Sequence, residues 1–252
     1  MVLTAVLPLL ATLQGPGDCA PEARVFVLAG QSNMAGLYAF EELLPPGLAA
    51  PQADVALWDG GASAPGWKPL APGSGVDFGP ELSLGRALAD ASPEDQVFLI
   101  KYAQGSTALH DDWAPPAGPE WLGLQATVAS ALGELTQAGI PFELGGMFWM
   151  QGEGDAVDGM GAAYEANLRA FVDQVRLDLA SPDLPFVLGR ILEGWGDPFN
   201  DQAVRAAQVA VGTTTPWATW VDTDDLSALG GHYDADGQVH LGERFAEALR
   251  SG

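Results

Sequence analysis

A serine near the start of the chain has the surroundings of a nucleophile. Ser32 closely follows an apolar run at 25–29 and the glycine Gly30. Such a run is typical of a buried parallel strand, and glycine tolerates the backbone angles of a sharp turn. Reactive groups collect at the carboxyl ends of such strands, because free backbone N–H groups there stabilise negative charge. Ser32 therefore lies where a nucleophile would be placed, although serine at this position also suits a helix N-cap.

A serine nucleophile needs a base, an acid that orients the base, and donors for the oxyanion. Of the three histidines, His232 lies just before the last predicted helix and is the best candidate for the base. His110 lies in an aromatic loop where it could contact a substrate, and His240 falls inside the last predicted helix, where we expect it to face solvent. The partners of such a site are recognised by geometry rather than by sequence separation, so a distance of 200 residues is no objection.

Apolar runs and helical periodicities alternate along the chain. The predicted strands are 25–29, 55–58, 96–102, 144–150, 185–192 and 218–221, and the predicted helices are about 80–90, 120–138, 162–179, 200–211 and 236–250. This alternation indicates an α/β fold with a parallel sheet covered on both faces, because each crossover helix packs back onto the sheet. The strand ends would then bring Ser32, Gly105 and Gln151 to one edge.

Composition limits the kind of partner. The 252 residues include 10 basic and 33 acidic side chains, which gives a formal net charge of −23. Such a surface repels phosphate backbones, so nucleic acids and anionic membranes are not expected as partners. The sequence has no apolar run long enough to span a membrane and no His/Cys/Asp cluster with metal-ligand spacing, so we expect no membrane span and no metal. Neither the oligomeric state nor the identity of a substrate can be read from composition.

The N-terminus predicts a short separate segment. Residues 1–13 form an apolar run of signal-peptide type, without the usual positive charge, and a Gly/Pro-rich stretch follows. We therefore expect residues 1–22 to be an N-terminal extension or a signal segment and residues 23–252 to form one domain. The segment is compatible with export, and without export we expect a cytoplasmic protein; the single cysteine, Cys19, leaves the compartment open.

Four motifs carry a resemblance to a known family. They are GQSNM at 30–34, FGPE at 78–81, WMQGExD at 149–155 and HYDxxGQxxLG at 232–242. In this order they resemble the sialate O-acetylesterase family of the SGNH-hydrolase superfamily, which overlaps a carbohydrate esterase family containing acetylxylan esterases. The resemblance extends from about residue 24 to residue 250, and the first and third motifs are the specific ones.

The resemblance implies both a fold and a reaction. The fold would be a three-layer α/β/α sandwich with a central parallel sheet of about five strands. The reaction would be removal of O-acetyl groups from carbohydrates, such as acetylated sialic acid or xylan, by a serine esterase that needs no metal or cofactor. By matching position, Ser32 is the nucleophile and His232 the base, and the oxyanion hole comprises the N–H groups of Ser32 and Gly105 with the Gln151 amide. Residues expected to touch the substrate are Gln31, Asn33 and Trp113.

One departure from the family pattern concerns the acid. Many relatives carry Asp three residues before the histidine, and here that position is Leu229. We expect Glu153 of the third motif to be the acid, with Asp222, Asp224 and Asp225 as alternatives that could equally be solvated turn residues. Loss of the acid can lower turnover by about four orders of magnitude.

A second hypothesis is a non-catalytic or degenerate carbohydrate-binding member of the same fold. It rests on Leu229 and on four tryptophans that could stack on sugar faces, although packing beneath loops is the more common role of such residues. These tryptophans are Trp58, Trp67, Trp113 and Trp195. A lipase or thioesterase would need a long apolar groove, which the Gly-rich polar loops do not suggest.

Overall fold

The computed structural model describes residues 23–73 and 77–251, and the predicted N-terminal extension or signal segment lies outside this part. Its centre is a seven-stranded sheet in the order β3-β2-β4-β1-β5-β6-β7. Every neighbouring pair is parallel except β2 with β3. The strands are β1 (Ala23–Gly30), β2 (Gln52–Asp59), β3 (Lys68–Leu70), β4 (Gln96–Ala103), β5 (Phe142–Met150), β6 (Phe186–Gly189) and β7 (Ala218–Val221).

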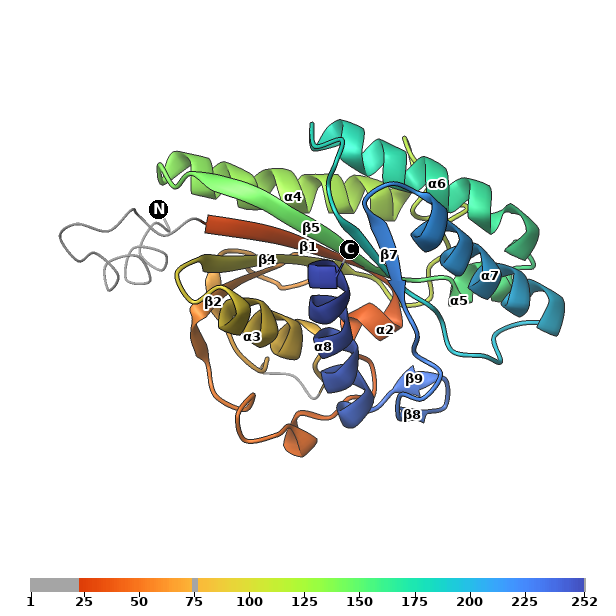
Figure 1. Cartoon of the computed structure of the whole chain (residues 1–252), viewed down its shortest axis with the longest axis horizontal. Coiled ribbons are helices and arrows are strands. Elements are labelled where there is room, and N and C mark those ends of the chain that lie inside the picture. Colours follow the sequence, from red (N-terminus) through yellow and green to blue (C-terminus); the bar gives the residue numbers. More distant parts are fainter. Residues whose placement is uncertain (1–22, 74–76, 252) are drawn as a thin grey trace.

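Helices cover both faces of the sheet, which confirms the predicted three-layer α/β/α fold (Figure 1). The helices α4 (Pro119–Gln137), α6 (Gly161–Asp178) and α7 (Pro198–Thr214) lie on one face, and α3 (Glu81–Ala91) and α8 (Ala235–Ser251) lie on the other. These five helices occur where the helical periodicity predicts them. The sheet is wider than the expected five or so strands, in part because the Gly/Pro-rich excursion after β2 contains the short antiparallel strand β3.

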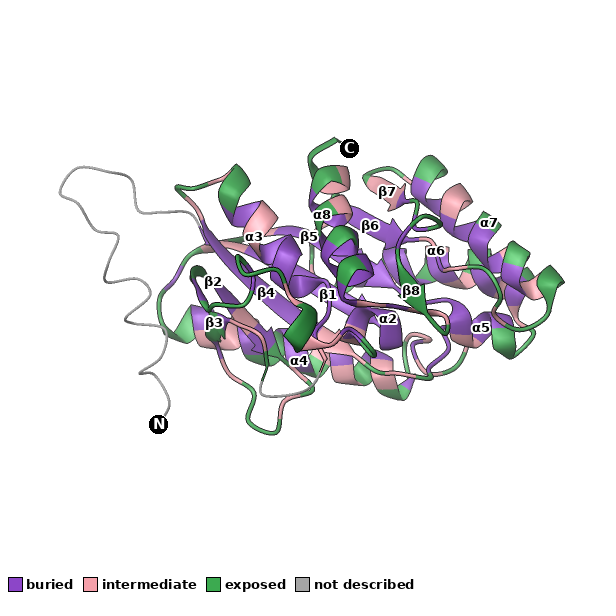
Figure 2. Cartoon of the chain, turned by 90° about the horizontal axis from the view of Figure 1, so that it is seen from below, coloured by how far each residue is buried: buried purple, intermediate pink, exposed green. Residues whose placement is uncertain are grey.

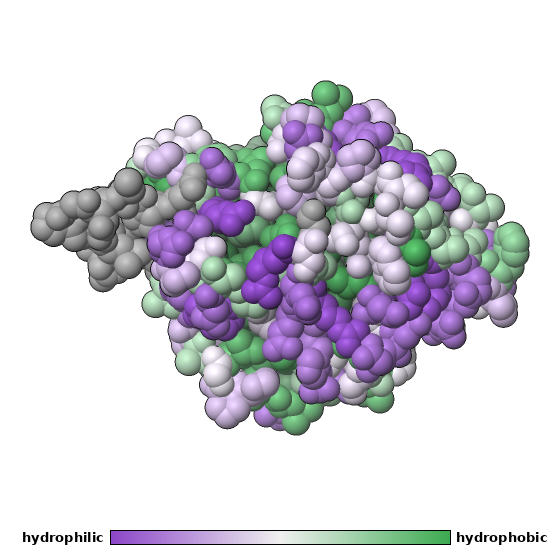
Figure 3. Space-filling model, viewed as in Figure 1, coloured by the Kyte–Doolittle hydropathy of each residue, from purple (hydrophilic) through white to green (hydrophobic). Residues whose placement is uncertain are grey.

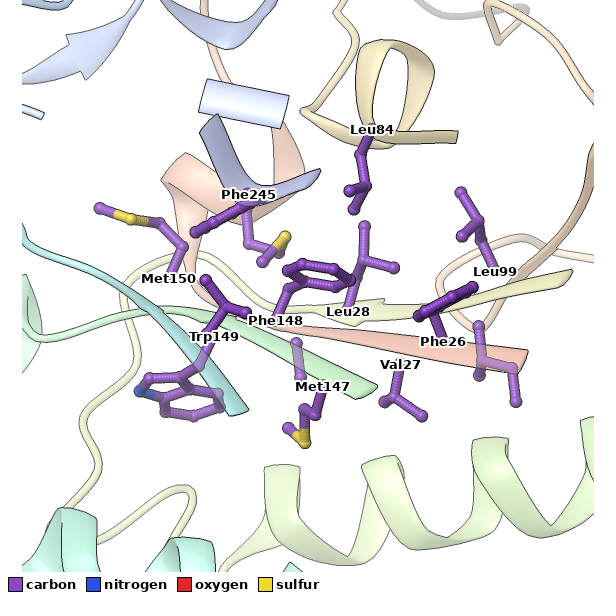
Figure 4. Packing of buried hydrophobic residues seen from close by; sticks show 14 of the residues in the cluster. Phe26, Val27, Leu28, Leu84, Leu99, Met147, Phe148, Trp149, Met150 and Phe245 are labelled. Carbon is purple, nitrogen blue, oxygen red and sulfur yellow. The ribbon is translucent and has the colours of Figure 1, made fainter. Parts of the chain in front are cut away.

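The central strands are apolar because they are buried on both faces. Side chains of β1 and β5 alternate between the two helical layers: Phe26 and Phe148 point toward the layer of α3 and α8, whereas Val27 and Met147 point toward the layer of α4 (Figure 4). Figure 2 shows the resulting pattern, in which the strands are buried and the outer faces of the helices are exposed. A strand buried on both sides needs no polar alternation, which is why these segments read as continuous apolar runs.

The register of the central strands aligns their carboxyl ends. Gly30 at the end of β1 is opposite Ala103 of β4 and Met150 of β5. The short helices α2 (Ser32–Ala35) and α5 (Glu153–Val157), which the periodicity did not predict, begin directly beyond this edge. The loops that follow β1, β4 and β5 therefore meet at one place in the molecule.

No helix in residues 23–73 or 77–251 has both the length and the apolar character that crossing a bilayer would require. The surface in Figure 3 carries many hydrophilic residues over α8 and around the small β8 (Ala228–Leu229) and β9 (His232–Tyr233) hairpin. This hairpin is separate from the main sheet and joins β7 to α8.

Candidate active site

The turn that presents Ser32 depends on a glycine. Gly30 has a φ of 149°, and a β-carbon there would lie 2.0 Å from the carbonyl oxygen of Met150. Only glycine allows this approach, which places the Gln31 N–H 2.9 Å from the same oxygen. Ser32 is then the first residue of α2, after the N-cap Gln31, so its hydroxyl is not the cap that sequence reasoning offered as an alternative.

The β8–β9 hairpin brings His232 to this serine. Its two turn residues, Gly230 and Gly231, have φ values of 61° and 83°, the left-handed conformation that tight hairpin turns require. The Nε2 atom of His232 lies 3.0 Å from the Ser32 Oγ across a sequence separation of 200 residues. Burial lowers the pKa of His232 below its ordinary value, and the backbone of Gly230 partly opposes this shift. The ring is therefore neutral at neutral pH and can accept the serine proton.

The structure does not bring a carboxylate to the other side of the histidine ring. Within the described residues, the buried Nδ1 of His232 has no side-chain hydrogen-bond partner. Leu229 is the direct cross-strand neighbour of His232 in the hairpin and is 58% exposed. The predicted first choice, Glu153, instead accepts a hydrogen bond of 2.7 Å from the Asn33 amide.

The three alternative acids are all paired with arginines. Asp222 contacts Arg190, and Asp225 lies 2.6 Å from Arg244. Asp224 bonds Arg205 at 2.8 Å and also contacts Arg190. The Arg244 guanidinium lowers the pKa of Asp225 to about 2. The three carboxylates are nonetheless exposed, at 56%, 46% and 72% of their side-chain surface, so they are solvated loop residues whose ion pairs hold the loop between β7 and the hairpin.

Gly105 lies beside the nucleophile. A β-carbon placed on Gly105 would be 3.7 Å from the Cβ of Ser32, so the turn after β4 packs closely on the serine. A side chain at this position would occupy the space next to the hydroxyl. The backbone of Gly105 therefore lies next to Ser32.

Comparison with known proteins identifies the family. The sequence model of the carbohydrate esterases described as sialic acid-specific acetylesterases matches residues 22–251. The chain belongs to this family. It is a carboxylic ester hydrolase, which confirms the resemblance drawn from the four motifs. A probable carbohydrate esterase of Arabidopsis thaliana is 26% identical over 262 residues, covering 94% of this chain and 96% of that protein.

Solved structures show the same fold. An X-ray structure of an Arabidopsis thaliana protein superposes with a TM-score of 0.76 at 23% identity, covering 92% of this chain and 99% of that one. NanS has a TM-score of 0.74 at 18% identity, covering 91% and 97%. A carbohydrate acetylesterase from Xanthomonas citri has a TM-score of 0.69 at 19% identity, covering 90% of this chain and 55% of that one. At these sequence identities, the structural similarity shows that this chain shares the fold of the three proteins.

Gln151 of the esterase is a buried structural amide, which corrects its expected place in the oxyanion hole. Its side chain is fully buried, and its Nε2 donates to the Thr107 carbonyl at 3.2 Å and to Asp155 at 2.8 Å. Its Oε1 accepts from the Tyr164 hydroxyl at 3.1 Å. Because both amide hydrogens are engaged, the side chain has no donor left for a substrate oxygen.

Gln31 and Trp113, expected to touch substrate, are also parts of the scaffold. Gln31 is 3% exposed, and its Oε1 accepts the N–H groups of Gly152 at 3.3 Å and Gly154 at 3.2 Å, which satisfies free donors at the start of α5. Trp113 is fully buried and donates from Nε1 to the Thr107 hydroxyl at 2.8 Å. Neither side chain is placed to bind a sugar. Trp58 and Trp67 are likewise buried.

Asn33, the third expected substrate contact, is fully buried and bonds to the His232 hairpin. Its Oδ1 accepts the Tyr233 N–H at 3.1 Å, and its Nδ2 donates to the Gly231 carbonyl at 3.3 Å. Its own carbonyl accepts from the Gln238 amide of α8 at 2.8 Å. The residue after the nucleophile thus holds the chain on both sides of the histidine.

Two aromatic side chains flank the histidine ring instead. Tyr38, 44% exposed, places its ring centroid 5.2 Å from that of His232, and Trp195 does so at 5.7 Å, both edge to face. Sequence reasoning named Trp195 among four tryptophans and missed Tyr38. Nothing in the local sequence marks Tyr38, because its approach depends on the path of the loop after α2.

The remaining two histidines contact other side chains. His110 Nδ1 lies 3.2 Å from Asp155, a buried carboxylate that also accepts the backbone N–H groups of Leu109 and His110. This arrangement ties the loop after β4 to α5. His240 is on the exposed face of α8, as expected. No group of three or more His, Cys, Asp or Glu in the described residues could hold a metal ion.

Proposed function

We propose that the esterase removes O-acetyl groups from carbohydrates, with Ser32 as the nucleophile and His232 as the base. The observation that carries this proposal is the 3.0 Å contact between Ser32 Oγ and His232 Nε2 at the carboxyl edge of the sheet. Two groups on opposite ends of the chain meet there, and the lowered pKa of His232 keeps its ring ready to accept a proton.

The reaction follows from these positions. His232 takes the proton of Ser32 as the Oγ attacks the acetyl carbonyl carbon. The N–H groups of Ser32 and Gly105 stabilise the oxyanion of the tetrahedral intermediate. His232 then gives its proton to the sugar oxygen, which leaves as an alcohol. Water, deprotonated by the same histidine, hydrolyses the acetyl-serine and releases acetate.

An acetylated carbohydrate is supported as the substrate by the family and by the walls of the site. The family and the Xanthomonas citri protein carry descriptions as carbohydrate acetylesterases. Tyr38 and Trp195 stand beside the catalytic pair, and aromatic side chains offer flat apolar surfaces on which sugar rings pack. The substrate class includes acetylated sialic acids and acetylated xylan.

The alternative is a carbohydrate-binding protein without turnover, favoured by the lack of a carboxylate at the Leu229 position. Acetate release from acetylated sialic acids, acetylxylan and p-nitrophenyl acetate separates the two. The proposal predicts release by the wild type and its loss in Ser32→Ala. Glycan binding without acetate release by the wild type would favour the alternative, and full release by Ser32→Ala would exclude Ser32 as the nucleophile.

A further inference from the structure

Asn33 uses its whole side-chain amide to connect three segments. One Nδ2 hydrogen goes to Glu153 Oε1 at 2.7 Å and the other to the Gly231 carbonyl at 3.3 Å, while Oδ1 accepts the Tyr233 N–H at 3.1 Å. Gly231 and Tyr233 are the residues immediately before and after His232. Fixing both peptide units leaves the histidine backbone little freedom to move relative to Ser32.

Glu153 makes the shortest of the three hydrogen bonds that set which way the Asn33 amide points. An asparagine side chain can flip and exchange its oxygen and nitrogen with little change in shape. In the flipped state, Nδ2 would face the Tyr233 N–H, and two donors would oppose each other. The acceptor Oε1 of Glu153 adds to this preference, because it accepts a hydrogen from Nδ2 only in the unflipped orientation. Both Glu153 and Asn33 are almost wholly buried, so water does not compete for these bonds.

The carboxyl can do this without being charged. Burial raises the pKa of Glu153 to about 7, against the lowering effect of Asn33 and of nearby backbone N–H groups. The other oxygen, Oε2, is buried and has no hydrogen-bond partner in the described structure. A proton on Oε2 therefore leaves the Oε1 bond to Asn33 intact. The hydrogen bond that orients Asn33 therefore does not depend on the charge of Glu153.

We propose that Glu153 and Asn33 form a positioning clamp that aligns His232 with Ser32 through the hairpin backbone. Glu153 thus acts through Asn33 and does not contact the ring as the orienting acid. This proposal uses the Ser32–His232 pair of the proposed function, but the hydrogen bonds of the clamp do not depend on turnover. The two can therefore be tested separately.

The decisive comparison is between two substitutions at one position. Glu153→Gln keeps an acceptor at the Oε1 position. The amide oxygen of the glutamine should face Asn33 Nδ2, because the opposite orientation would place two NH2 groups against each other. Glu153→Leu removes the acceptor at similar volume. The clamp predicts that Glu153→Gln stays within about tenfold of the wild-type kcat, whereas Glu153→Leu loses about 100-fold or more in kcat with little change in KM, since misalignment affects the chemical step.

Backbone hydrogen exchange gives a readout without substrate. The Tyr233 amide should exchange at about the wild-type rate in Glu153→Gln and about tenfold or more faster in Glu153→Leu. Leu135→Ala, in the buried face of α4, serves as the control for general destabilisation. It should lower the melting temperature without selective exchange at Tyr233. A wild type that lacks esterase activity would overturn the proposed function, while exchange would still test the clamp.

Two results would overturn the clamp. A loss of about 10⁴-fold in Glu153→Gln, with the acid limb of the kcat/KM profile shifted, would show that the charge itself acts on His232. If Glu153→Leu kept both the wild-type exchange rate at the Tyr233 amide and the wild-type kcat, Asn33 would hold the hairpin without Glu153. The clamp predicts instead that Glu153→Gln leaves the acid limb at the wild-type pH.

Discussion

The two halves of the active site are built in different ways. Ser32 follows the central strand β1, which is paired on both sides and fixed at its end by the approach of Gly30 to Met150. His232 belongs to a hairpin with strands of two residues each, outside the main sheet. The nucleophile therefore takes its position from the core, whereas the base takes its position from a few side-chain bonds. The hairpin is the half in which small changes should alter catalysis most selectively.

The largest effect is expected from removal of the base. His232→Ala should lower kcat/KM for p-nitrophenyl acetate by about four orders of magnitude, because Ser32 then has no proton acceptor. The melting temperature should change little, since the ring is only partly buried. His240→Ala, on the exposed face of α8, is the matched control and should retain wild-type activity. Equal losses in both variants would break the distinction between the two histidines.

A second prediction concerns Glu153, whose titration should make the free energy of unfolding depend on pH. Glu153 has a folded-state pKa of about 7 against an ordinary value of 4.5. The folded protein therefore holds this proton more tightly than the unfolded chain does. The carboxyl stabilises the fold below pH 4.5, and this contribution is lost as the pH rises toward 7 and stays lost above it.

Each pKa unit corresponds to about 1.4 kcal/mol, so the loss is on the order of 3 kcal/mol. Urea unfolding of the wild type and of Glu153→Gln at pH 4.5 and pH 8 measures it. From pH 4.5 to pH 8, the free energy of unfolding of Glu153→Gln should rise relative to that of the wild type by about this amount. A constant difference between the two proteins would show that Glu153 titrates normally.

A third prediction compares the two glycines of the hairpin turn. A β-carbon at Gly231 would lie 2.7 Å from the Trp195 ring, whereas one at Gly230 would meet nothing within 4 Å. Both positions have positive φ, so alanine at either costs about 1–2 kcal/mol of backbone strain. Only Gly231→Ala must also displace Trp195, and it should lower kcat/KM about tenfold more than Gly230→Ala does. Equal kinetics for the two variants would show that the hairpin tolerates this displacement.

The smallest effect is a gain. Leu229 is opposite His232 in the hairpin, and directly paired side chains in antiparallel strands lie on the same face about 5 Å apart. In Leu229→Asp a carboxylate should reach the Nδ1 side of the ring, raise the pKa of His232 and increase kcat several-fold at pH 8. Leu229→Asn has the same shape without the charge and should not shift the pH profile. A profile that is identical in both variants would mean that position 229 does not reach the ring.

The same contrast explains what the sequence could and could not predict. Ser32 was recognisable because an apolar run, a glycine and a serine are local features, and the helices were recognisable from their periodicity. Gly105 was placed at the same edge by the alternation of strands and helices alone. The approach of His232 to Ser32 was predicted from the family motifs and from the position of the histidine before the last helix.

Polar residues next to the site were harder to assign, because their partners are distant in sequence. Gln151, Gln31 and Asn33 follow strand ends, as substrate-binding residues do, yet each bonds to buried backbone or side-chain groups of other loops. Trp113 resembled a sugar platform and is packed in the core. Residue type and position suggested contact with substrate, and only the three-dimensional arrangement shows that these side chains support the loops.

The most direct test of the central claim is covalent labelling of the nucleophile. Diethyl p-nitrophenyl phosphate reacts with serines that an adjacent base activates, and peptide mass spectrometry locates the adduct. We expect one adduct on the peptide containing Ser32 in the wild type, none in Ser32→Ala, and labelling slowed by orders of magnitude in His232→Ala. Labelling at another residue, or an equal rate in His232→Ala, would contradict it.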